Sequence, residues 1–191
     1  MPTSPRTVNA GLIGAIIVNA RGSSKPDGLP KDVDREFVTL FIVYDENQSW
    51  YLDHNIRTYA GTPAKIDKGE FLPVDIEGNS DLFTGGGFAT VNHKYTINGY
   101  LFGNMPMMTM KKGERVRWYL ISLGDGFNFH SPHWHGNTVL WNKQRTDVIT
   151  LMPAQMAVAD MVPDNPGMWM FHCHVSDHLK AGMHAHYHVL P

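Results

Sequence analysis

The residues whose types and spacing could do chemistry gather in the second half of the chain. Ten of the eleven histidines lie at or after His93. One group is the segment HSPHWHG (130–136), and the other is HCHVSDHLKAGM (172–183). The second group contains Cys173, the only cysteine of the chain, so an internal disulfide is excluded. Imidazole, thiolate and thioether side chains in one region are typical ligands of a transition metal.

Side chains alternate between two faces along a β-strand, and this alternation sorts the possible ligands into two sets. Each of the two His-X-His pairs points to one face, whereas the cysteine inside the second pair points to the other. His130 is an odd number of residues from His133, so it is also expected on that other face. The pattern predicts two sites that lie back to back across a sheet.

The two sets have different chemistry. The first set is His130, Cys173, His178 and Met183. Two imidazoles, a thiolate and a weak axial thioether form the ligand set of a blue copper centre, although zinc is a rival for the His and Cys ligands. The second set is His133, His135, His172 and His174. Four imidazoles suit copper that binds oxygen species rather than copper that only carries electrons.

The elements that must position these residues are short strands. Frequent turn signals between brief apolar stretches predict an all-β protein, a sandwich or barrel. The expected strands are 11–18, 35–44, 95–97, 109–110, 116–122, 127–135, 148–151, 157–162, 167–174 and 184–190. A short helix is expected within 45–59, a linker at 21–30, and a bend or loop at 85–87.

Composition narrows the class of protein. A chain of 191 residues can bury a substantial core as one large domain. A formal net charge of -2 argues against a protein that grips nucleic acid, and 42% apolar residues argue against wholesale disorder. No apolar run approaches the ~20 residues that span a bilayer, so neither nucleic acid nor a membrane is an expected partner.

The chain resembles the multicopper oxidases, and their ceruloplasmin-like branch in particular, over nearly all of residues 11–191. The motifs FHCHVSDHLKAGM and HSPHWHG carry this resemblance, with further agreement in DENQSWYLDHNI, INGYLFGN and the strand that ends in Trp118-Tyr119-Leu120. It implies a Greek-key cupredoxin β-sandwich or barrel at 31–191, the last domain of that family. Residues 1–30 resemble the closing strand of a preceding cupredoxin domain, followed by a linker.

The resemblance also implies ligands and partners. Type 1 copper falls to the first set of residues, and half of a trinuclear copper cluster falls to the second. The family's cluster takes eight histidines from two domains, so one half-set implies a homo-oligomer (dimer, trimer or hexamer) or pairing with another cupredoxin domain. A periplasmic or secreted location is implied as well, although this chain shows no clear signal peptide.

The function expected from the resemblance is a copper oxidase. A phenolic or metal-ion substrate would give single electrons to type 1 copper, and the path from Cys173 to His172 and His174 would carry them to the cluster, where O₂ is reduced to water. Two alternatives stay open at this stage. One is a blue copper electron-transfer protein without oxygen chemistry, and the other is a nitrite-reductase-like enzyme with a single type 2 copper between domains.

Three further groups of residues are interpreted as structural. The alternating histidines of the last expected strand favour a solvated face, with a surface metal site as the alternative; they are His184, His186 and His188. The methionines of MPMMTM (105–110) favour adaptable packing over a Cu(I) patch. Acidic residues in a loop-like stretch are expected to be solvated surface; they are Glu70, Asp75, Glu77 and Asp81.

Overall fold

The computed structural model describes residues 5–61, 92–124 and 128–191. The chain divides into two compact units, one formed by 1–14 with 43–95 and the other by 15–42 with 96–191. The expected boundary between residues 30 and 31 stays a prediction. Within the described ranges, no helix has both the length and the apolar character that crossing a membrane requires.

The described part of the first unit contains the strand residues 43–45 and 93–95 and three short helices. The helices are α1 (Pro5–Val8), the 3₁₀ helix η1 (Glu46–Gln48) and α2 (Leu52–Tyr59). Asp45 caps η1 because its carboxylate accepts the Asn47 N–H at 3.1 Å. Ser49 has extended backbone and separates η1 from α2. The short helix expected within 45–59 is confirmed, in two pieces.

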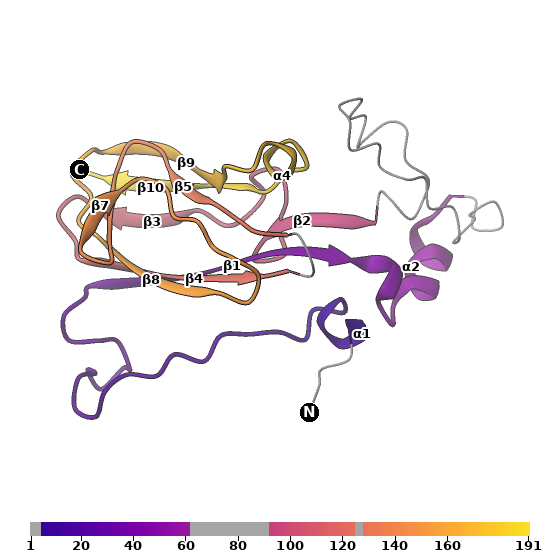
Figure 1. Cartoon of the computed structure of the whole chain (residues 1–191), viewed down its shortest axis with the longest axis horizontal. Helices are drawn as coiled ribbons and strands as arrows, with labels where there is room; N and C mark the ends of the chain where they lie inside the picture. Colours follow the sequence, from indigo (N-terminus) through magenta and orange to yellow (C-terminus); the bar gives the residue numbers. More distant parts are fainter. Residues whose placement is uncertain (1–4, 62–91, 125–127) are drawn as a thin grey trace. The chain divides into compact units, whose positions relative to one another are not determined.

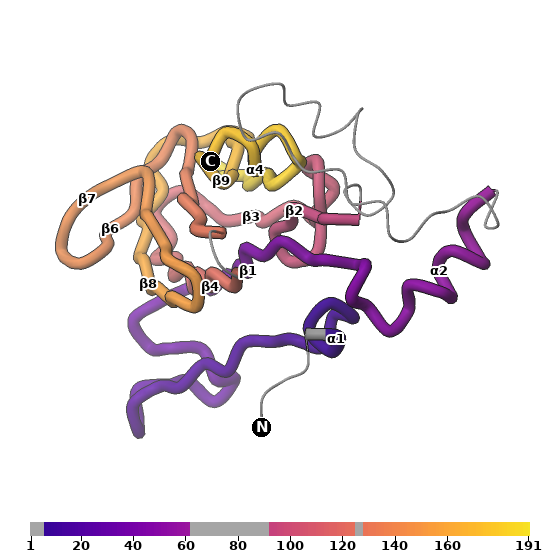
Figure 2. Tube along the Cα trace, turned by 45° about the vertical axis from the view of Figure 1, so that its right-hand side comes forward, coloured from indigo at the N-terminus to yellow at the C-terminus, as the bar shows by residue number. Residues whose placement is uncertain are grey.

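The second unit is built on two β-sheets. Two strands, β1 (Arg35–Asp45) and β2 (His93–Ile97), belong to this unit only in part. One sheet has the order β2-β1-β4-β8-β6-β7, and the other has the order β3-β10-β9-β5. Figure 1 shows β9 and β10 in one layer and β4 and β8 in the other, and Figure 2 shows the β6–β7 hairpin at an edge. The predicted all-β architecture is confirmed. The strands are β1 (Arg35–Asp45), β2 (His93–Ile97), β3 (Met108–Lys111), β4 (Val116–Leu123), β5 (Pro132–Trp134), β6 (Val139–Trp141), β7 (Gln144–Thr146), β8 (Met156–Met161), β9 (Gly167–Cys173) and β10 (His184–Leu190).

An aromatic cluster joins the two sheets of the second unit. The ring of Trp118 on β4 lies 5.1 Å from that of Phe171 on β9 and 6.0 Å from that of Tyr187 on β10. The ring of Trp134 on β5 lies 5.6 Å from Trp118. All four side chains are buried, and each aromatic side chain removed from water stabilises the fold by about 1.5–3 kcal/mol. The cluster therefore holds β5, β9 and β10, which carry the histidines, against the opposite sheet.

Two expected strands are absent and a third is shorter. Residues 11–18 form no strand, and Leu12, Ile16 and Val18 are exposed. A strand needs a neighbouring strand to pair with, and no strand in the described ranges pairs with this segment. The expected strand 127–135 contracts to β5, and the expected strand 148–151 contributes only isolated bridges, from Val148 to His133 and from Leu151 to His130.

The hairpin of β6 and β7 was missed from the sequence. Its two-residue turn is Asn142-Lys143, with φ of 49° and 64°. Positive φ at both turn residues matches the right-handed twist of the flanking strands, but lysine is not a residue that usually marks such a turn. The expected acidic stretch and the glycines at 85–87 lie outside the described residues.

Gly136 directly follows the first His-X-His pair and has a close neighbour. A Cβ on Gly136 would lie 2.2 Å from Cδ2 of Trp169, whereas a Cβ on Gly113 would meet no atom within 4 Å. Both glycines have left-handed backbone, with φ of 74° and 81°. Any alanine at either position is therefore strained, but only at Gly136 does it also collide with a ring.

Gly136→Ala should destabilise the protein more than Gly113→Ala. We expect Gly113→Ala to cost about 1–2 kcal/mol from the left-handed backbone alone, and Gly136→Ala to cost a further 1–3 kcal/mol or so from the displaced ring. Guanidinium unfolding curves of the two variants measure both values. Equal losses would mean that Trp169 does not pack on Gly136 in solution.

Candidate metal centre

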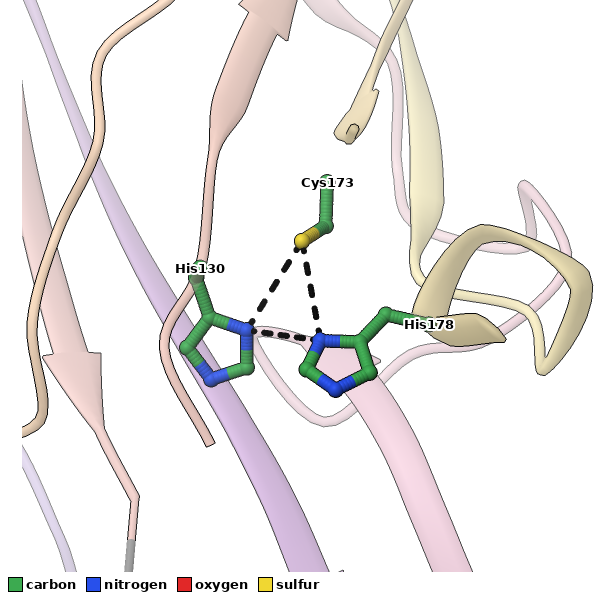
Figure 3. A group of neighbouring side chains, drawn as sticks. All are labelled: His130, Cys173 and His178. Atoms are coloured by element: carbon green, nitrogen blue, oxygen red, sulfur yellow. Dashed lines mark hydrogen bonds between the residues drawn. The ribbon is translucent and has the colours of Figure 1, made fainter. Parts of the chain in front are cut away.

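Three side chains from separate parts of the second unit converge on one point (Figure 3). His130 precedes β5, Cys173 ends β9, and His178 lies on α4 (Ser176–Lys180). The Cys173 Sγ atom is 3.8 Å from His130 Nδ1 and 3.6 Å from His178 Nδ1, and the two nitrogens are 3.2 Å apart. The point equidistant from these three atoms lies about 2 Å from each, which is the bond length of a transition metal to imidazole. The group therefore has the size of a metal site.

Backbone hydrogen bonds fix the segments that carry these side chains. The His130 N–H donates to Leu151 O at 2.9 Å, and the Leu151 N–H donates back at 2.8 Å. The Cys173 N–H donates to Met183 O at 3.0 Å, and the Met183 N–H donates to His178 O at 2.9 Å. Met183, the fourth member of the predicted set, is fully buried, and the last two bonds tie its backbone to Cys173 and His178.

Burial sets the protonation of this group. Desolvation raises the pKa of the Cys173 thiol, and the backbone N–H of Ser131, 3.4 Å from Sγ, opposes that rise. Desolvation lowers the pKa of His130 to about 3 and that of His178 to about 4. Without a cation, the site therefore holds neutral imidazoles and a neutral thiol at pH 7. A bound metal ion would supply the charge that a thiolate requires.

A second group gathers around the imidazole of His172. Its Nε2 lies 3.1 Å from His133 Nδ1 and 3.0 Å from His135 Nε2. Its Nδ1 lies 2.8 Å from the carbonyl oxygen of Cys173, which can only accept, so Nδ1 carries the proton. Burial lowers the pKa of His172 to about 4, so the ring is neutral at pH 7 and its Nε2 presents a lone pair. Such a lone pair, facing two more imidazoles, is ready to bind a metal.

The structure places the fourth predicted histidine beside this group. The ligand nitrogens of His133, His135 and His172 lie within 4.8 Å of one another, and His174 is not in that set. The ring centroid of His174 is 5.0 Å from that of His133 and 5.4 Å from that of His172. His135 and His174 are exposed. The group is therefore open to solvent on the side where further ligands could join.

The register of β9 relates the two groups. His133 stands opposite His172, and Pro132 stands opposite Cys173. Because neighbouring residues of a strand project from opposite faces, His172 and Cys173 belong to different groups although one peptide bond joins them. The two groups thus lie on opposite faces of the sheet, at the same edge.

One residue beside these groups was missed from the sequence. The Asp147 carboxylate lies 3.6 Å from Nε2 of His133, the ring nitrogen that does not face His172. A carboxylate at the second nitrogen of a metal-binding histidine orients the ring and fixes its tautomer. The isolated bridge between Val148 and His133 brings Asp147 there. Nothing in the local sequence signals that bridge.

In the metal-free protein, the free energy of unfolding should fall as the pH drops from 6.5 toward about 4. The ordinary histidine pKa is 6.5, whereas those of His130, His172 and His178 are about 3, 4 and 4 in the folded state. The unfolded chain thus binds more protons in this window, and stability present above pH 6.5 is lost below it. Guanidinium midpoints measured at a series of pH values test this. A flat wild-type profile would contradict the burial of these rings.

Comparison with known proteins gives a consistent set of relatives. The family model described as multicopper oxidase matches residues 77–191. The chain is 40% identical over 187 residues to ferroxidase HEPHL1 of Mus musculus, which covers 97% of this chain and 15% of the relative. It is 40% identical over 186 residues to ceruloplasmin of Mus musculus, with 97% and 16% covered. The chain therefore spans about 15% of the length of these relatives.

Solved structures share the fold at lower identity. Blue copper oxidase from Nitrosomonas europaea has a TM-score of 0.56 at 19% identity, over 88% of this chain and 47% of that one. A multicopper oxidase from Campylobacter jejuni, described as a metallo-oxidase, has a TM-score of 0.51 at 16% identity, over 84% of this chain and 31% of that one. These likenesses concern the fold, and they confirm the predicted cupredoxin-type sandwich.

Proposed function

Because this chain belongs to the multicopper oxidase family, we propose that it acts in a copper-dependent oxidase that takes single electrons from a reducing substrate and reduces O₂ to water. Copper is the cofactor of this family. The main observation behind the proposal is that the two ligand groups meet at His172 and Cys173, which are adjacent in the chain. One group offers a thiolate and imidazoles, the other offers imidazoles alone, and adjacent residues connect them.

The proposal assigns each predicted ligand to a copper site. Type 1 copper would be held by His130, Cys173, His178 and Met183. Half of a trinuclear cluster would be held by His133, His135, His172 and His174. Copper at these sites would supply one-electron transfer and the reduction of O₂. The donor types present fit copper because imidazole and thiolate accept both of its oxidation states.

The chain's own residues prepare these sites. The buried walls around Cys173 exclude water, and the Ser131 N–H donates to its sulfur, a contact that tunes the reduction potential of a bound copper. The Cys173 carbonyl holds Nδ1 of His172 protonated, which directs Nε2 to the second site. The backbone from Cys173 to His172 and His174 is the shortest connection between the sites, and we assign the electron path to it.

Ferrous iron is the reducing substrate that we favour. A relative 40% identical to this chain is named a ferroxidase. A phenolic donor is the alternative, and the assay below separates the two. The relatives are several times longer than this chain, so the identity of the electron donor is itself proposed for this protein. The periplasmic or secreted location also stays a prediction.

The cluster would be completed by a second set of imidazoles. His135 and His174 are exposed, and the second group shows three convergent nitrogens in the described residues. We propose that another cupredoxin domain, in a second copy of this chain or in another part of the protein, supplies the remaining ligands. Closed symmetric pairing is common among homo-oligomers and would bring two half-sets face to face.

Oxygen uptake by copper-loaded protein, with copper counted per chain, tests the function. If two copies pair, one type 1 ion and half of three shared ions give about 2.5 copper per chain, and O₂ is consumed with Fe(II) as donor. Nitrite reduction is measured beside it. A protein with about one copper per chain and no O₂ uptake would be an electron-transfer protein, and nitrite turnover without O₂ uptake would indicate the nitrite-reductase-like alternative.

Cys173→Ser should abolish the intense visible absorption of thiolate-bound Cu(II) and the oxidation of external donors. Cys173 is the only thiol, so no other residue of this chain can supply that charge transfer. Absorption spectra and copper analysis of the variant measure the effect, and copper at the imidazole cluster should remain. A blue variant would overturn the type 1 assignment.

Met183→Leu should leave copper bound and raise the type 1 reduction potential. A weak axial thioether stabilises Cu(II) more than Cu(I), so its removal favours Cu(I). Redox titration of the blue band measures the shift. Met161→Leu is the matched control because Met161 is equally buried but lies on β8 of the other sheet. An unchanged potential in Met183→Leu would remove Met183 from the ligand set.

A further inference from the structure

The backbone of His135 is fixed by a buried side chain as well as by its neighbouring strand. β5 ends at Trp134, so His135 is the first residue beyond the strand. Its N–H donates to Met170 O at 3.0 Å, and its carbonyl oxygen accepts a hydrogen bond from the Tyr187 hydroxyl. Tyr187 lies on β10 and is fully buried, so this hydroxyl reaches His135 from the core. The exposed imidazole of His135 is thus anchored from inside the fold.

The side-chain amide of Asn137 orients that hydroxyl. Its Oδ1 accepts from the backbone N–H groups of Asp164 and Asn165, each at 3.2 Å. Because only an oxygen can accept these two bonds, Nδ2 is the atom that donates to Tyr187 Oη at 3.1 Å and to Asn165 O at 3.4 Å. The Tyr187 hydroxyl accepts from Asn137 and therefore directs its own proton to His135 O. The buried amide has all of its hydrogen-bonding positions in use, which is typical of a rigid polar network.

The turn before β9 holds the residue between His135 and Asn137. Asn165 Nδ2 donates to Gly136 O at 3.0 Å, and Asn165 O accepts from Trp169 Nε1 at 2.9 Å. Trp169 is the ring that lies against Gly136. Every residue of this short segment is thus tied by side-chain hydrogen bonds to the turn before β9 or to β10.

The imidazoles of this group are supported in different ways. His133 lies within β5 and stands opposite His172 in the ladder, and Nδ1 of His172 is bound to the Cys173 carbonyl. His135 follows the end of the strand, and the network around Tyr187 takes over its support there. The result is that His135 Nε2 lies 3.0 Å from His172 Nε2.

We propose that Tyr187 and Asn137 are positioning residues for the imidazole group, whose hydrogen bonds hold His135 where its Nε2 faces that of His172. Partners that orient a metal ligand from outside the coordination sphere change metal affinity by about 10–100-fold. The inference rests on the proposed function, since His135 is assigned there to the copper cluster. It adds two residues that belong to neither ligand set.

Tyr187→Phe tests the positioning in the metal-free chain. The variant keeps an aromatic ring in the core and removes only the hydroxyl that donates to His135 O. The mobility of each histidine ring is measured by ¹³C relaxation of its Cε1–H group in histidine-labelled protein. The order parameter of His135 should fall toward the values of about 0.6 or less that mark flexible groups, and that of His133 should not change.

Tyr119→Phe is the matched control for this measurement. It removes a tyrosine hydroxyl that is bound to Glu36, on the sheet that does not carry the histidines of the group. The order parameter of His135 should stay at its wild-type value in this variant. An unchanged order parameter of His135 in Tyr187→Phe, or an equal fall in the control, would overturn the proposal.

Copper binding in a double-mutant cycle separates positioning from a general loss of stability. Copper is titrated against a competing chelator in the wild type, Tyr187→Phe, His135→Gln and the double variant. Tyr187→Phe should weaken copper at the imidazole group by about tenfold and keep the blue absorption band, but it should have no further effect when His135 is already replaced. Equal weakening in both backgrounds would mean that Tyr187 acts through the fold rather than through His135, and would refute the proposal. A wild-type chain that binds no copper at this group would refute the proposed function, while the ring mobilities would still decide the role of Tyr187.

Discussion

The antiparallel pairing of β9 between β5 and β10 is the constraint on which the rest of the structure depends. It sets His172 opposite both His133 and His184, and it sets Cys173 opposite Pro132. A slip of one residue in this register would exchange the two faces and place the thiol among the imidazoles of the cluster group. The buried ring of Phe171 opposes such a slip because it would have to leave the core and its contact with Trp118 of the opposite sheet. The arrangement of the candidate metal ligands thus depends on the packing of the core.

The local sequence pattern was enough to predict most of the fold and the grouping of the candidate ligands. The two His-X-His pairs and the cysteine between His172 and His174 needed only the two-residue period of a strand. The all-β architecture followed from turn residues. The predictions that failed concern elements that depend on partners far along the chain. Residues 11–18 are apolar and β-prone, but no strand in the described ranges pairs with them. β6 and β7 have three residues each, too few for a periodic signal.

The same limit applies to the details of the site. Asp147 reaches His133 through an isolated bridge, and His130 is paired with Leu151 through another. Neither fact is encoded in spacing along the chain. Alternation gave each histidine a face, but only the folded structure shows which ring nitrogen is free and which is bound to the backbone. The ligand roles themselves stay predictions until metal is measured.

The loop from Cys173 to Met183 is closed by its own backbone hydrogen bonds. These bonds restrict how far the donor atoms on the loop can move. An ion in this pocket would change its surroundings little between two charge states, which keeps the reorganisation energy of electron exchange small.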